Sequence, residues 1–137
     1  MGIFNYKKGT YEEKIECAET WYGYDVCFFG DNLYLEGNIN IYIRDRKSLE
    51  TKCSLELHES YQLDADYVYV LKDGTFLCGM SNKYNNILRQ YAYSNNNIIE
   101  LSKLSFAGYK DNFKLIYQLK NGNIIGSISN EEYFMLK

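Results

Sequence analysis

The chain has 137 residues, enough for one domain with its own hydrophobic core. Apolar residues make up 46% of it and aromatic residues 17%, which excludes an intrinsically disordered chain, and the fifteen tyrosines favour β-strands. The net charge is −3 and no basic run is longer than Lys7–Lys8. These charges argue against nucleic acid as a partner, because phosphate backbones require clustered positive charge.

The sequence contains no continuous apolar stretch of the ~18 residues that a membrane-spanning helix needs. Its first residues also lack the apolar segment of a secretory signal, so we expect a cytoplasmic protein. The four cysteines show no CxxC spacing, and we expect them to be reduced and packed in strands rather than bound to zinc. They are Cys17, Cys27, Cys53 and Cys78. We predict neither a metal site nor a cofactor.

A short phrase occurs three times along the chain. It reads FFGDNLYLEG at Phe28–Gly37, LKDGTFLCG at Leu71–Gly79 and LKNGNIIG at Leu119–Gly126, and an alternating apolar segment precedes each copy. Aligned on their last glycines, the copies are 42 and 47 residues apart. Each copy predicts a hairpin, since Asp-Gly and Asn-Gly supply the positive φ angles of tight turns. The expected two-residue turns are Asp31-Asn32, Asp73-Gly74 and Asn121-Gly122.

The segments that follow the hairpins also recur. Two more strands, joined at polar turns 45–48 and 94–97, are expected after the first two hairpins, and one strand after the third. The N-terminal segment supplies a strand, a basic turn and a second strand. The unit is therefore a four-stranded antiparallel meander of ~40–47 residues in a single all-β domain. We divide the chain into the back half of a unit, two complete units and an incomplete one, at 1–20, 21–63, 64–109 and 110–137.

These units resemble the WD40-type β-propeller repeat. INIYIRD at Ile39–Asp45 stands where that family has an apolar strand ending in Trp-Asp, with Arg44 in place of the tryptophan. ILRQYAY at Ile87–Tyr93 keeps the strand without the dipeptide, and Leu57-His58 takes the place of Gly-His. The resemblance implies about three blades of a partial or half propeller. A β-sandwich or barrel with similar hairpins is the alternative.

Propellers close with about four to eight blades, so three blades leave sheet faces uncovered. We expect self-association of two chains into a closed six-bladed ring, completion of another protein's propeller, or a longer parent chain. The expected function is a non-enzymatic protein-interaction or scaffold module.

In a propeller, the loops between blades and those joining the second and third strands share one face. Aromatic residues on such loops suit protein recognition. The candidate binding residues are Trp21, Tyr22, Tyr24, His58, Tyr61, Asp64, Asp66, Tyr84 and Tyr109. Five acids in these loops favour a basic partner: Asp25, Glu59, Asp64, Asp66 and Asp111.

No catalytic residue is predicted, since His58 is the only histidine and has no supporting motif. Two alternative functions remain open. A glycan- or small-molecule-acting protein would use the carboxylate pair Asp64 and Asp66, which we expect in a loop before a strand. A ribonucleoprotein subunit would gather five basic residues on one face: Lys83, Arg89, Lys103, Lys110 and Lys114.

Overall fold

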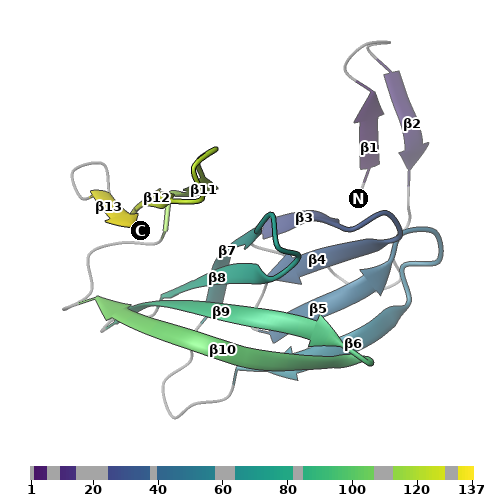
Figure 1. Ribbon diagram of the computed structural model, residues 1–137. Coiled ribbons are helices and arrows are strands. Elements are labelled where there is room, and N and C mark those ends of the chain that lie inside the picture. The colour runs from purple at the N-terminus through teal and green to yellow at the C-terminus, as the bar shows by residue number, and fades with distance from the viewer. Residues whose placement is uncertain are drawn as a thin grey trace.

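The chain folds as an all-β protein. The computed structural model describes residues 2–5, 10–14, 25–37, 40–57, 64–81, 85–106, 113–128 and 133–137, the first two ranges as backbone only. Every regular element in these ranges is a strand, which confirms the predicted fold class. The strands form four antiparallel sheets with sequential neighbours paired, and none of these sheets closes on itself as a barrel would (Figure 1).

A hairpin and three larger sheets follow one another along the chain. The hairpin pairs β1 (Gly2–Asn5) with β2 (Thr10–Lys14). The first sheet contains β3 (Asp25–Phe29), β4 (Leu33–Gly37), β5 (Asn40–Asp45) and β6 (Thr51–Glu56). The second sheet contains β7 (Asp64–Val70), β8 (Phe76–Ser81), β9 (Asn86–Ser94) and β10 (Asn97–Phe106). The third sheet contains β11 (Leu115–Gln118), β12 (Ile124–Ser127) and β13 (Tyr133–Leu136).

The repeated phrases form hairpins whose loops are one residue longer than predicted. The N–H of Gly74 donates to the carbonyl of Leu71 over 3.0 Å, and the N–H of Leu71 donates to the carbonyl of Thr75 over 2.8 Å. The loop therefore has three residues, with Gly74 at a φ of +86°. This is a type I turn followed by a left-handed residue, and it needs a positive φ at only one position.

The third copy has the same turn, since Gly122 and Leu119 repeat both hydrogen bonds and Gly122 has a φ of +91°. The two turns also touch. The backbone N–H of Lys72 donates to the Gln118 side chain over 2.9 Å, and the side-chain ammonium of Lys72 donates to the Leu119 carbonyl over 2.8 Å. A two-residue hairpin with two positive φ angles occurs instead at Asn95 and Asn96.

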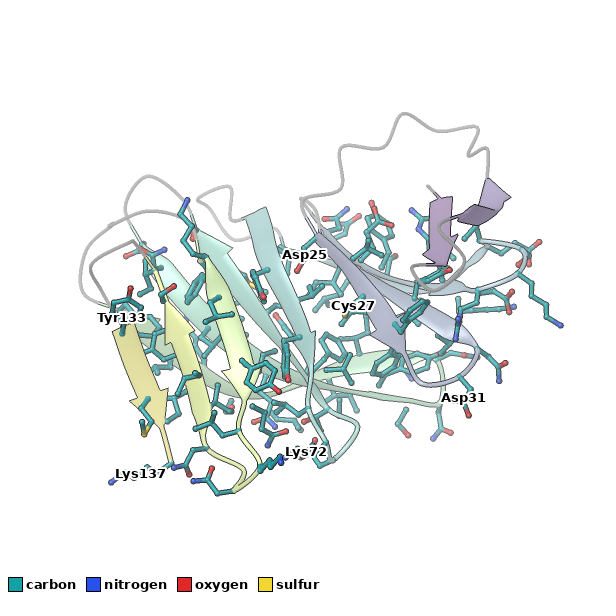
Figure 2. All side chains as sticks on the ribbon, turned by 90° about the horizontal axis from the view of Figure 1, so that it is seen from above. Asp25, Cys27, Asp31, Lys72, Tyr133 and Lys137 are labelled. Atoms are coloured by element: carbon teal, nitrogen blue, oxygen red, sulfur yellow. The ribbon has the colours of Figure 1, made fainter. Side chains whose placement is uncertain are left out.

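The three sheets are stacked face against face in chain order. Their first strands, β3, β7 and β11, are neighbours, as Figure 2 shows from above. For each sheet we call the side directed at the next sheet its forward face and the opposite side its rear face. One core lies between the forward face of the first sheet and the rear face of the second, around Leu35, Ile43, Val68, Phe76 and Cys78. A smaller core lies between the second and third sheets, around Leu77, Leu88, Phe113 and Ile116.

Each of these cores depends on a glycine at the crossing of two sheets. A Cβ at Gly37 would lie 2.9 Å from the Ala65 carbonyl oxygen and 2.9 Å from a Val68 methyl group. A Cβ at Gly79 would lie 2.6 Å from the ring of Phe113. The start of the next unit therefore crosses both glycines at a distance that no larger residue allows.

The third position of this series is Ser127 rather than Gly126. Leu115 pairs with Ser127 as Asp25 pairs with Gly37 and Tyr67 with Gly79. The alignment on the last glycines is therefore wrong by one residue, and the second interval is 48 residues rather than 47. A one-residue shift in a strand reverses the face of every side chain. Gly126 accordingly lies on the rear face, against the ring of Phe134.

We predict that Gly79→Ala destabilises the protein, because its methyl group would overlap the Phe113 ring. Overpacking of this kind costs about 1–3 kcal/mol, measured as the free energy of unfolding in urea. Ser105→Ala, at an exposed position of β10, is the control and should change that free energy little. Equal stability of the two variants would contradict the close contact between Gly79 and the Phe113 ring.

Candidate interaction surface

The predicted loop face falls largely outside the described residues. This applies to Trp21, Tyr22, Tyr24, His58, Tyr61, Tyr84 and Tyr109. The backbone of Asp64 and Asp66 is described, and both residues lie inside β7 rather than in a loop before it. The expectation of a solvated loop at this carboxylate pair is therefore wrong, while the placement of the two side chains is not described.

Asp25 has a structural role instead of the predicted place among loop acids facing a partner. It begins β3, and its carboxylate accepts hydrogen bonds from the N–H of Val68 over 2.8 Å and from the N–H of Val26 over 3.0 Å. Figure 2 labels Asp25 between β3 of the first sheet and β7 of the second. Burial raises the pKa of this carboxyl, although both backbone hydrogen bonds lower it. Asp25 thus connects β3 to β7.

The described cysteines behave as packing residues. Cys27, Cys53 and Cys78 are free thiols on strands, as predicted, and all three pack in the core between the first two sheets. Burial raises the pKa of Cys27 to about 12, with the Asp25 charge adding to it, and burial raises the pKa of Cys78 well above its ordinary value. Both thiols therefore stay protonated at neutral pH, and neither is an activated nucleophile.

The buried charges of the sheets are paired. The Arg44 guanidinium lies 2.8 Å from the Glu36 carboxylate, and Arg89 lies 3.2 Å from Glu100. Arg89 is buried, so it is not available for the basic surface that the ribonucleoprotein alternative requires. Lys83 and Lys110 of that set are outside the described residues.

A hollow of about 280 Å³ lies between the end of β6 and strands β9 and β10. Glu56, Arg89, Tyr91 and Glu100 contribute its polar groups. Burial raises the pKa of Tyr91 to about 12, so its phenol stays protonated at neutral pH. Within this hollow the Arg89 guanidinium lies 3.2 Å from the Glu100 carboxylate.

Within the described ranges, no three histidine, cysteine or acidic side chains gather as a metal site. The same part of the chain contains no helix able to span a membrane.

Within the described residues no further sheet covers the forward face of the third sheet, which we call the open face. It consists of Leu115 and Tyr117 on β11, Ile125 and Ser127 on β12, and Tyr133 and Met135 on β13. None of these six side chains is charged. Tyr117 is 50% exposed, Tyr133 76% and Met135 56%, and Leu115 is exposed as well. Figure 2 shows Tyr133 at the outer side of the stack.

The open face corresponds to the two faces that are buried within the chain. Gly37 and Gly79 hold the crossing position on the first two forward faces, and both contact the next unit. Ser127, the smallest side chain of the open face, holds that position in the third sheet. The sequence carried a signal for this face that the repeat alignment missed. Leu115, Ile116 and Tyr117 are consecutive apolar residues, a pattern typical of a strand with both faces covered.

Comparison with protein-family models found no match to the chain, and comparison with curated proteins found no similar sequence. The resemblance to WD40-type repeats therefore has no support from a family match.

We predict a pH dependence of stability that distinguishes two aspartates. Because the pKa of Asp25 is raised on folding, its favourable contribution is present at low pH and is lost as the pH rises through the raised value. The stability of the wild type relative to Asp25→Asn should therefore fall as the pH rises above the ordinary carboxyl value of 3.8. Urea unfolding of both proteins at a series of pH values measures it.

Asp45→Asn is the matched control, with the opposite sign. The Asp45 carboxylate accepts hydrogen bonds from the N–H groups of Ser48 and Lys47, which lower its pKa. Its contribution is present at neutral pH and is lost as the pH falls. If stability changed with pH in the same direction for both variants, burial would not be what determines the pKa of Asp25.

Proposed function

We propose that this chain is a non-enzymatic protein-interaction module of β-propeller type, which contributes blades to a larger assembly. In this interpretation the three sheets are successive blades, and β3, β7 and β11 are their inner strands. The sequential pairing of strands within each sheet supports it, as does the contact of each first strand with the next one. The repeated crossing at Gly37 and Gly79 supports it as well.

The observation that carries the proposal is the open face. Contiguous apolar patches are rare on proteins that act alone, and they mark surfaces for interaction. Here four of the six side chains are exposed and apolar or aromatic. Tyrosine and methionine on such a surface give large contact areas, and both are enriched at interfaces between proteins.

The partner that fits this face is a β-sheet of another subunit. The open face is the surface of a pleated sheet, and its equivalents in the first two units are each covered by a sheet. Two sheets pack about 10 Å apart when their side chains interdigitate. A ligand with phosphate or carboxylate groups would find no positive charge among the six side chains of this face.

We test the proposal by photo-crosslinking in cells. A photoreactive benzoylphenylalanine at position 133 replaces the most exposed side chain of the open face. We expect it to form a discrete covalent product with a protein, identified by mass spectrometry of the gel band. The matched control carries the same group at Lys120, which is exposed in the turn between β11 and β12.

A product seen from position 133 and not from position 120 supports the proposal. Absence of a product from position 133, or the same products from both positions, would show that the open face has no protein partner.

A further inference from the structure

We propose that the occupant of the open face is a second copy of this chain, which covers it with the exposed β3 side of its first sheet. The inference rests on the proposed function and names its partner. Its basis is a second exposed apolar row, which lies on β3 at the rear face of the first sheet. On that face Val26 is 43% exposed and Phe28 is 54% exposed.

Val26 is the exact register equivalent of two residues that are buried between sheets. Val26 pairs with Glu36 on β4, Val68 with Cys78 on β8, and Ile116 with Gly126 on β12. All three side chains lie on the rear face of the first strand of their sheet. Val68 is 2% exposed and Ile116 is fully buried, because each packs against the preceding sheet. Among the described residues only the β1–β2 hairpin precedes the first sheet, and no four-stranded sheet covers Val26 as one covers Val68.

The next position along these strands repeats the pattern. Phe28 pairs with Tyr34 as Val70 pairs with Phe76. Val70 packs against the core between the first two sheets, whereas Phe28 is exposed. Tyr34 and Glu36, on β4 beside this row, are buried. The exposed part of the rear face is therefore the β3 row of Val26 and Phe28, where the Arg46 guanidinium lies 4.2 Å from the centre of the Phe28 ring.

One chain thus carries both halves of the contact that joins its own sheets. The first half is a small residue, Ser127, in an apolar forward face. The second half is an apolar first strand with Val26 at the position of Val68. Within the chain, the corresponding halves meet where Val68 packs beside Gly37. A second copy supplies the missing half to each end.

Two copies close this contact completely if they are related by a two-fold axis. The open face of each copy then covers the β3 row of the other, so that the pair contains two identical contacts and no free end. Each copy contributes three sheets, and six blades lie within the range in which propellers close. Without closure, the same head-to-tail contact would produce filaments.

The first measurement is the solution mass of the purified chain by light scattering after size exclusion. We expect a mass of twice 16.1 kDa that does not increase further as the protein concentration is raised. Val26→Glu and Tyr133→Glu each place a charge in the contact from one side, and each should reduce the mass to 16.1 kDa. Ile99→Glu, at an exposed apolar site of β10 outside both faces, is the control and should remain a pair.

Mixing the two variants gives the sharper result. The Val26→Glu copy keeps an intact open face, and the Tyr133→Glu copy keeps an intact β3 row. A mixture of equal amounts should therefore restore a pair that neither variant forms alone, through one of the two contacts. If circular dichroism shows that Val26→Glu is unfolded, Phe28→Glu replaces it, since that position is more exposed.

Each other outcome overturns the inference. A wild-type mass of 16.1 kDa at all concentrations shows that the occupant is not a second copy. A pair that survives Val26→Glu uses two open faces against each other, and the mixture would then recover nothing. A mass that grows beyond two copies shows an open filament. A crosslink from position 133 to a different protein would support the proposed function, but it would contradict the inference that the occupant is a second copy.

Discussion

The crossing of one sheet over a small residue of the preceding sheet is the contact on which the rest of this structure depends. At Gly37 and Gly79 the start of the next unit occupies the space that a Cβ would need. Protein interiors are closely packed, so a larger residue at either point would separate the sheets and open the core between them. The burial of Val68, of Ile116 and of the Asp25 carboxyl follows from this spacing.

A stack of sheets built from one repeated contact has two end faces, and these faces are the surfaces available to a partner. The rear face of the first sheet leaves Val26 and Phe28 exposed, and the forward face of the third leaves an apolar surface. Hydrophobic surface of this kind is stabilised by burial in proportion to its area. Between the first two sheets, the thiols of Cys27 and Cys78 are protonated at neutral pH, and the guanidinium groups of Arg44 and Arg89 are paired with carboxylates.

Local sequence predicted the strands and hairpins well because their signals are short in range. Alternating apolar residues and Asp-Gly or Asn-Gly pairs act over a few positions, and β7, β8, β11 and β12 follow from them. The length of the loop was missed, since Gly74 suits either a two-residue turn or the last position of a three-residue loop. The third crossing position was missed for a separate reason: Gly79 follows the turn glycine Gly74 by five residues, whereas Gly126 follows Gly122 by four, so Ser127 holds the equivalent position.

The sequence by itself determined that the chain is all-β, that its hairpins repeat, and that Cys27, Cys53 and Cys78 lie on strands, because these properties depend on neighbouring residues. Only the tertiary structure decided which residues are covered. Val26, Val68 and Ile116 are all apolar residues on first strands, and no local pattern separates the exposed one from the buried two. Among the described residues, Val68 and Ile116 pack against the four-stranded sheet before their own, whereas Val26 does not, and such contacts join residues far apart in the chain.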